Sequence, residues 1–264
     1  MIAIAVFIGY VLTNSNTVFD YSILYGILTG VFINSAIMIT NDIADVEIDR
    51  VNNVKRPLVT GSINKREAYL MAIIIALLGI LTSILTGIIT FAIAFSFLIL
   101  GLLYNYKLKG IPLVGNLAVS ASVAIPFVYG GVISGGYLDL KVFLLSISAF
   151  AINTYREIIK DVIDVEGDKT QNLKTLPILI GNKALYIAYL FLVIGLTAGA
   201  TPLLIEVGVE RYVYGILILL AEAILIYSAY LSRKCEKKHI LKAKNIALVG
   251  MLTGMLAFLF SSII

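Results

Sequence analysis

The chain has 264 residues, of which 60% are hydrophobic and only 14% are charged. In soluble domains about a quarter of the residues are charged. The composition therefore excludes an ordinary soluble protein and predicts an all-α, polytopic membrane protein. The net charge of +4 does not point to nucleic acid, because the basic residues flank apolar segments. The single cysteine and single histidine exclude an internal disulfide and a Cys/His metal cluster.

Apolar segments follow one another along the whole chain, and we expect about nine transmembrane helices. The first is shorter than the roughly 20 residues that a span needs, so we expect it to be truncated or tucked against the bundle. The segments are 1–14, 18–42, 67–86, 88–106, 113–133, 141–161, 183–204, 211–231 and 243–264.

The basic residues are distributed unevenly between the two sides of these segments. Of the 20 Lys and Arg, all except Lys141 and Arg211 lie in, or at the edge of, the loops after the second, fourth, sixth and eighth segments. By the positive-inside rule these loops face the cytoplasm. We therefore expect an integral, multi-pass cell-membrane protein whose N-terminus is cytoplasmic.

Two of the apolar segments end in the same carboxylate pattern, Asp-x-x-Asp-x-x-x-Asp. At about 100° per residue, the three Asp of each set fall within roughly a 60° arc of one helix face. Both sets lie on the side expected to face the cytoplasm, so the active site is expected there as well. The first set is Asp42, Asp45 and Asp49, and the second is Asp161, Asp164 and Asp168.

Six carboxylates at one membrane site would repel one another unless cations lay between them. Hard oxygen ligands in this number suit Mg²⁺, which binds a few carboxylates together with the phosphates of a substrate. The two sets therefore predict an intramembrane site for Mg²⁺ and a diphosphate, in which all six Asp are catalytic metal ligands.

A shift of 119 residues, from Asp42 to Asp161, aligns the two acidic segments and also brings Asn34 onto Asn153. Both Asn lie on the same side of the helix as the Asp and are candidate substrate-binding residues. We expect one domain over 1–264 that contains a parallel repeat, roughly 1–110 and 111–234, followed by a final helix.

Each acidic segment is followed by a long polar loop, 50–66 in the first half and 169–183 in the second. Both loops contain a basic residue, a proline, a short apolar stretch, a glycine and Asn-Lys. Loops of this length in a compact fold are often lids, so we expect cytoplasmic caps over the site, with plain connectors as the alternative. Asn64 and Glu67 predict a capping box at the start of the next helix.

A prenyl diphosphate would need cations for its leaving diphosphate and aromatic faces for an allylic carbocation. Tyr104 lies at the end of the fourth segment beside two lysines, although interfacial Tyr and snorkelling Lys are the alternative interpretation. The basic residues placed near the carboxylates are Lys55, Arg56, Lys107, Lys109, Arg156 and Lys160.

The segments NDIADVEIDRVNNVKRPLVTG and YREIIKDVIDVEGDK resemble the two signatures of the UbiA-type intramembrane prenyltransferases, and LYNYKLKGIPLVGN extends the resemblance. The resemblance implies helices around a central cavity, cytoplasmic cap loops, Mg²⁺ dependence and prenyl transfer from a diphosphate. It assigns Asn41 to the first signature and Arg56 to contact with diphosphate. The family's Tyr-x-x-x-Lys element departs here, because Leu108 is the fourth residue after Tyr104, so Lys107 or Lys109 would serve.

Within the family, the chain most resembles the archaeal enzymes that add a geranylgeranyl group to geranylgeranylglyceryl phosphate and form the second ether bond of archaeal lipids. The resemblance implies a lipid-like acceptor whose phosphate would be held by Lys55, Arg66, Arg156 or Lys174. An aromatic acceptor, such as a quinone, haem or chlorophyll precursor, is the alternative, and a cation transporter is a more distant one. Prenyl diphosphate, the acceptor and membrane lipids are the expected partners, without nucleic acid or an obligate protein partner.

Overall fold

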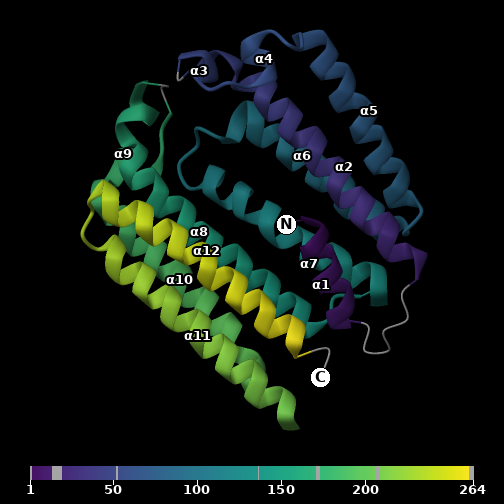
Figure 1. The fold of residues 1–264 in the computed structure, drawn as a ribbon, viewed down its shortest axis with the longest axis vertical. Helices are drawn as coiled ribbons and strands as arrows, with labels where there is room; N and C mark the ends of the chain where they lie inside the picture. Colours follow the sequence, from purple (N-terminus) through teal and green to yellow (C-terminus); the bar gives the residue numbers. More distant parts are fainter. Residues whose placement is uncertain are drawn as a thin grey trace.

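The computed structural model describes residues 2–13, 20–51, 53–135, 137–170, 173–205 and 208–261. Within these ranges the secondary structure is helical, with no strand (Figure 1). The longer α-helices are α1 (Ile2–Thr13), α2 (Tyr21–Ala44), α5 (Lys65–Ile84), α6 (Ile88–Leu103), α7 (Val114–Gly135), α8 (Leu140–Thr170), α10 (Ala184–Ala200), α11 (Gly208–Ser232) and α12 (Lys237–Phe260). The short elements are α3 (Val46–Val51), α4 (Pro57–Thr60), η1 (Tyr104–Leu108), α9 (Leu176–Ile180), η2 (Gly181–Lys183) and η3 (Thr201–Leu204).

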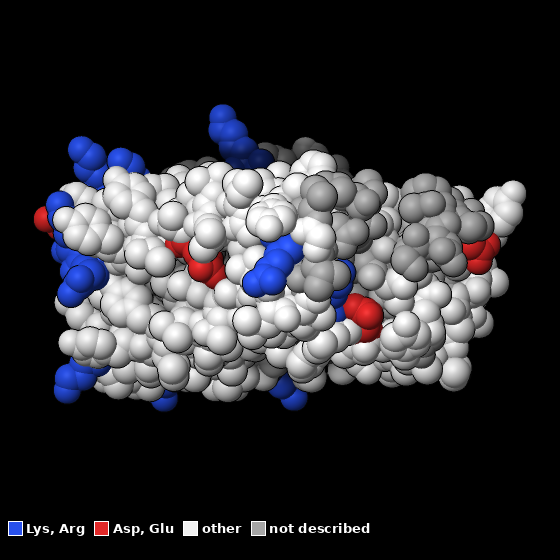
Figure 2. Space-filling model, turned by 90° about the horizontal axis from the view of Figure 1, so that it is seen from below, with Lys and Arg blue, Asp and Glu red and all other residues white. Residues whose placement is uncertain are grey.

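Eight helical stretches of the described chain are long and apolar enough to cross a membrane, and the polytopic all-α class is confirmed. The remaining expected segment, 1–14, forms α1, which has only 12 residues. It is tucked into the bundle, since the side chains of Val6 and Ile8 are fully buried. Much of the remaining surface is uncharged, as Figure 2 shows for one face, and carries many exposed Leu, Ile and Val side chains.

Two helix boundaries differ from those expected by more than five residues. Helix α8 continues to Thr170, nine residues beyond the predicted end of its segment, so the second acidic set lies within the helix. Helix α12 begins at Lys237, six residues earlier than predicted. In both cases hydropathy marked only the apolar part, whereas the hydrogen-bonded helix continues into polar sequence.

Helices α1 and α7 cross closely near the middle of the molecule (Figure 1). A Cβ atom added to Gly9 would lie 2.0 Å from the Phe127 carbonyl oxygen, and one added to Gly130 would lie 1.9 Å from the Val6 oxygen. No side chain fits at such distances, so this crossing requires glycine on both helices. Close backbone approach at small residues is a typical way for membrane helices to pack.

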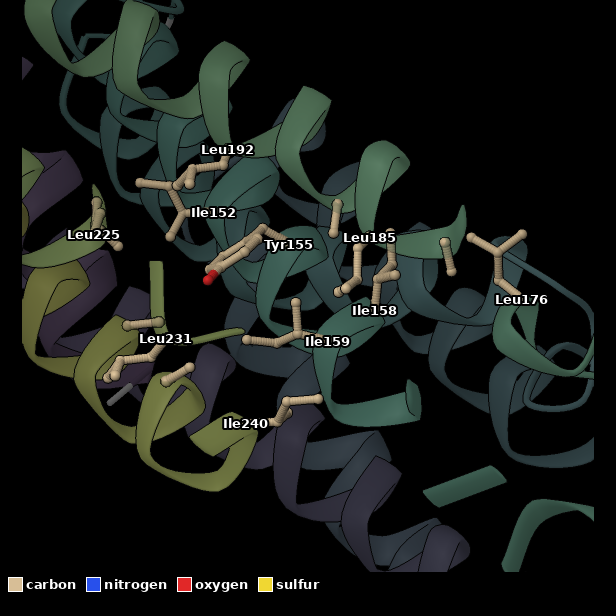
Figure 3. Packing of buried hydrophobic residues seen from close by; sticks show 14 residues of the cluster. Ile152, Tyr155, Ile158, Ile159, Leu176, Leu185, Leu192, Leu225, Leu231 and Ile240 are labelled. Carbon is tan, nitrogen blue, oxygen red and sulfur yellow. The ribbon is translucent and has the colours of Figure 1, made fainter. Parts of the chain in front are cut away.

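A buried cluster joins α8, α10, α11 and α12 (Figure 3). Its largest member, Tyr155, is fully buried, and its hydroxyl lies 2.8 Å from the Ser228 hydroxyl. Ser228 in turn donates to the Ala243 carbonyl at 2.9 Å. This chain of bonds satisfies the buried polar groups and fixes α8, which carries the second acidic set, against α11 and α12.

Candidate active site

The first acidic set lies where α2 meets α3, so it spans a one-residue interruption of the helix. Helix α2 ends at Ala44, Asp45 has backbone angles of φ −90° and ψ 1°, and α3 begins at Val46. The N–H of Asp45 still donates to the Asn41 carbonyl at 2.9 Å, and the N–H of Asp49 donates to the Asp45 carbonyl at 2.8 Å. The interruption is a local change of backbone angle at one residue, in the bridge region, and the helical hydrogen bonds continue across it.

Two cations contact the three carboxylates of the first set. Nη1 of Arg56 lies 2.5 Å from Oδ1 of Asp42 and 3.0 Å from Oδ2 of Asp49. Nζ of Lys109 donates to both oxygens of Asp45, at 2.8 Å and 2.6 Å. Arg56 is the N-cap residue of α4, so the loop after α3 brings it back over its own acidic set.

A π-helical turn explains why Lys109, and not Lys107, reaches the carboxylates. The segment Tyr104–Leu108 is π-helical, and the N–H of Lys109 donates to the Tyr104 carbonyl at 3.1 Å. In an α-helix the N–H that bonds to a carbonyl belongs to the residue four positions later, whereas here it belongs to the fifth. The wider π-helical turn therefore puts Lys109 where an α-helix would put the fourth residue after Tyr104. The side chain of Lys107 is exposed and makes no ion pair within the described residues.

The second acidic set lies on the continuous helix α8, so here the predicted arc applies. Oδ2 of Asp161 accepts a hydrogen bond of 2.7 Å from the side-chain amide of Asn116 on α7. Oδ2 of Asp168 is buried beside the Thr175 hydroxyl and makes no well-formed hydrogen bond within the described chain. Thr175 occupies the N-cap position of α9 that Arg56 occupies in α4. A neutral residue thus takes the place of the cation in the second loop, and the described part of that loop forms no ion pair with the second set.

Electrostatic interactions through Tyr104 and Lys109 connect the two acidic sets. Tyr104 lies within electrostatic reach of Asp45 from the first set and of Asp161 from the second. Lys109, which is bonded to Asp45, also interacts electrostatically with Asp168. Tyr104 and Lys109 therefore lie between the sets, at the end of α6 and η1.

The two polar loops leave their helices in the same way. The N–H of Val54 donates to the Asp49 carbonyl at 2.9 Å, and the N–H of Leu173 donates to the Asp168 carbonyl at 3.0 Å. Each loop then forms a short helix, α4 or α9, and both lie at the end of the molecule where the acidic sets are (Figure 1). The predicted capping box follows the first loop, with reciprocal bonds of 2.9 Å between Asn64 and Glu67.

A cavity of about 460 Å³ lies next to the acidic sets, among α1, α7, α8, α10, α11 and α12. This volume is typical of small-molecule sites. Its walls are mostly apolar, with Asn34, Asn153 and Arg156 among the polar lining residues. Along α8 the lining runs from Leu145 to Arg156, and Asp161 follows after roughly 7.5 Å of helix rise. An apolar cavity thus ends close to the carboxylates.

The residues present fit Mg²⁺ bound together with a substrate. Within the described ranges, no three acidic, His or Cys side chains form a group that could hold a metal without other ligands. Mg²⁺ does not require such a group, because it commonly uses one or two carboxylates and completes its shell with water and substrate phosphates. Oδ2 of Asp168 is buried without a hydrogen-bond partner in the described chain, and the buried Oδ2 of Asp49 has only its ion pair with Arg56. Such hard carboxylate oxygens are suitable metal ligands.

Not every predicted basic residue lies at the acidic sets. The side chains of Lys55 and Lys174 are exposed and form no ion pair within the described residues. Lys160 lies 3.5 Å from Glu157 and interacts electrostatically with Asp161 and Asp164. Lys160 therefore faces the second set, whereas the two exposed lysines do not contact either set.

Three residues of the site were not predicted from the sequence. Asn105 is buried and accepts a bond of 3.2 Å from Asn41, while Asn116 contacts Asp161. Glu157 binds both Arg156 and Lys160. Glu157 could have been predicted from the sequence, because it precedes Asp161 by four residues and therefore lies on the same helix face. The two Asn approach from other helices, and no local spacing indicates that.

Residues 2–259 match a sequence profile described as the UbiA prenyltransferase family. A protein from Methanobrevibacter smithii named digeranylgeranylglyceryl phosphate synthase is 36% identical over 264 residues, covering 98% of this chain and 92% of that protein. A protein of the same name from Archaeoglobus fulgidus is 35% identical over 242 residues, covering 90% of this chain and 83% of that protein.

Solved structures have the same architecture. A structure described as giving insights into the biosynthesis of digeranylgeranylglyceryl phosphate synthase in membranes has a TM-score of 0.87 and 29% identity, covering 99% of this chain and 93% of that one. A UbiA homolog from Archaeoglobus fulgidus, bound to GPP and Mg²⁺, has a TM-score of 0.73 and 22% identity, covering 97% of this chain and 94% of that one. The similarity to the second structure shows a shared fold and nothing further.

Proposed function

This chain belongs to the UbiA prenyltransferase family, and we propose that it transfers a geranylgeranyl group from geranylgeranyl diphosphate to the free hydroxyl of geranylgeranylglyceryl phosphate. The observation that carries the proposal is that Tyr104 interacts with an Asp of each acidic set, close to an apolar cavity. The carboxylates suit a metal-bound diphosphate, and the cavity suits a long apolar chain. The names of the relatives from two archaea support the lipid acceptor.

In the proposed reaction, the bond between the allylic carbon and the diphosphate oxygen breaks, and a bond forms between that carbon and the acceptor hydroxyl oxygen. When bound, Mg²⁺ neutralises the diphosphate and the charge that grows on it as it leaves. We assign all six Asp as its ligands. A homolog of the same fold has been solved with GPP and Mg²⁺, which supports a site for a metal and a diphosphate in this fold. The hydroxyl proton passes to the released diphosphate or to an Asp.

Residues of this chain supply the remaining stabilisation. Arg56 and Lys109 already lie at the first set, where they would exchange a carboxylate oxygen for a diphosphate oxygen. Fixed charges in a partly dry site are usually the largest catalytic contribution. Tyr104 lies between the sets and offers an aromatic face to the allylic cation.

The proposal includes the placement of the site in the membrane. The protein is an integral membrane protein. The excess of basic residues in the loops on the side of the acidic sets supports, by the positive-inside rule, a site that faces the cytoplasm. Loops 50–66 and 169–183 would then be caps that close over the diphosphate. A parallel repeat, roughly 1–110 and 111–234, accounts for their matching hydrogen bonds at Asp49 and Asp168.

One assay tests the proposed function. Purified protein is incubated with Mg²⁺, geranylgeranyl diphosphate and either geranylgeranylglyceryl phosphate or an aromatic acceptor such as a hydroxybenzoate, and the products are identified by mass spectrometry. We expect digeranylgeranylglyceryl phosphate and no prenylated aromatic product. Prenylation of the aromatic ring alone would overturn the acceptor and leave the prenyl transfer intact.

A further inference from the structure

We propose that Arg156, held in place by Glu157, binds the phosphate of the acceptor at a position separate from the metal–diphosphate site. This inference rests on the proposed function, because it concerns the second substrate of that reaction. It selects one residue from the several basic side chains that the sequence offered for this role.

The first argument is location. Arg156 is the only basic residue that lines the 460 Å³ cavity, as far as the described residues show. The other candidates for the acceptor phosphate, Lys55, Arg66 and Lys174, have exposed side chains. An amphiphilic acceptor with one apolar chain and one phosphate needs a long apolar cavity with a cation at its polar end. Arg156 and this cavity meet that requirement.

The second argument is direction around α8. Leu145, Ala149 and Ile152 line the cavity and lie within roughly 40° of Arg156 around the helix. The three Asp of the second set lie roughly 80–140° away from Arg156. Arg156 therefore starts from the face of α8 that lines the cavity, and its contact with Glu157 turns the guanidinium towards the edge of that face nearest the Asp. A phosphate bound there lies beside the carboxylates that would hold the metal, and not among them.

The third argument is the state of the guanidinium group. Nη1 of Arg156 lies 2.6 Å from Oε1 of Glu157, and the side chains are only 19% and 12% exposed. Adjacent residues on a helix point about 100° apart, so this ion pair requires the Arg156 side chain to lie along the helix surface towards Glu157. Nε is buried without a hydrogen-bond partner in the described chain, so donors remain for a ligand. A planar guanidinium suits a phosphate better than an ammonium group does.

The charge of the local cluster is also suitable. Glu157 accepts from both Arg156 and Lys160, so this one carboxylate is shared between two cations and does not by itself neutralise Arg156. The phosphate and the free hydroxyl of the acceptor lie on adjacent carbons of its glycerol. A phosphate bound at Arg156 therefore keeps the hydroxyl within about one helical turn of Asp161, where the prenyl group is delivered.

The test combines a change in the enzyme with a change in the acceptor. Steady-state constants are measured for wild type, Arg156→Gln, Arg156→Lys and Glu157→Gln with geranylgeranylglyceryl phosphate and with geranylgeranylglycerol, which lacks the phosphate. We expect Arg156→Gln to raise the acceptor KM about 10- to 100-fold for the phosphate and about 2-fold or less for the alcohol. Arg156→Lys should recover part of the loss, and Glu157→Gln should raise the same KM by less.

The KM for geranylgeranyl diphosphate should stay within about 2-fold of wild type, which also shows that the variants are folded. Arg233→Gln, an exposed charge in the loop before α12, is the matched control and should change neither KM. Equal losses with both acceptors, or a raised KM for the prenyl diphosphate, would overturn the inference. A wild-type enzyme that prenylates neither glyceryl acceptor would overturn the proposed function itself, which is a distinct result.

Discussion

Lys109 donates to both carboxylate oxygens of Asp45, at 2.8 Å and 2.6 Å, from a π-helical turn that begins at Tyr104. In the family pattern the lysine follows the tyrosine by four residues, whereas Lys109 follows Tyr104 by five. The π-helical turn holds one residue more than an α-helical turn and so compensates for this difference in spacing. The lysine thereby lies between the two acidic sets. Its neighbour Lys107, only two residues away, stays exposed.

Lys109→Ala should lower kcat/KM for the prenyl diphosphate about 100-fold, because a fixed charge beside the leaving group is lost. Lys107→Ala is the matched control and should stay within about 2-fold of wild type. Steady-state kinetics of both variants at saturating Mg²⁺ check this prediction. A larger loss in Lys107→Ala than in Lys109→Ala would contradict the assignment.

Arg56→Ala should raise the KM for the prenyl diphosphate about 10-fold or more, because Arg56 is the cap-loop cation at Asp42 and Asp49. Arg56→Lys should recover only part of the loss, since an ammonium cannot make a bidentate contact. Lys55→Ala removes the adjacent, exposed charge and serves as the control. Equal effects of Arg56→Ala and Lys55→Ala would indicate a general effect of charge in this loop.

Asp161→Ala should abolish transfer while the protein still inserts into the membrane, and Asp42→Ala should do the same. Asn116→Ala removes the amide that donates to Asp161 at 2.7 Å, and it should raise the Mg²⁺ concentration needed for half activity about 10-fold. Titration of activity with Mg²⁺ checks this, with Asn245→Ala on an exposed part of α12 as the control. Near-normal turnover of Asp161→Ala at saturating Mg²⁺ would refute the metal assignment.

Gly130→Ala should destabilise the protein strongly, because the added Cβ would lie 1.9 Å from the Val6 carbonyl oxygen. The backbones of α1 and α7 would have to separate, and we expect a loss of more than about 3 kcal/mol or failure to fold. Gly167→Ala on α8 is the control, since a Cβ there meets no atom within 4 Å. Thermal unfolding in detergent compares the two, and an unchanged Tm for Gly130→Ala would show that the crossing is looser than described.

Loops 50–66 and 169–183 should exchange amide hydrogens more slowly when Mg²⁺ and a non-hydrolysable prenyl diphosphate analogue are added. The reason is that caps which close over a ligand lose local opening motions. Hydrogen–deuterium exchange with mass spectrometry measures this, and the loop between α11 and α12 serves as the internal reference. Unchanged protection in both loops would leave them as plain connectors.

Local sequence patterns were sufficient for the class of fold and for the helix face that carries the second acidic set. Hydropathy depends on composition over about 20 residues, so it predicted the membrane-crossing helices. The spacing of Asp161, Asp164 and Asp168 predicted one face of α8, because helix periodicity is a local property. The capping box of Asn64 and Glu67 was predicted for the same reason.

Contacts between distant segments were decided only by the tertiary structure. Asn116 meets Asp161 because α7 packs on α8, and Arg156 lines a cavity because helices from both halves of the chain surround it. The choice of Lys109 over Lys107 depends on a π-helical turn, and the break at Asp45 depends on one pair of backbone angles. Composition and periodicity place a residue on a helix face, whereas the partner of that face depends on how helices far apart in the chain pack together.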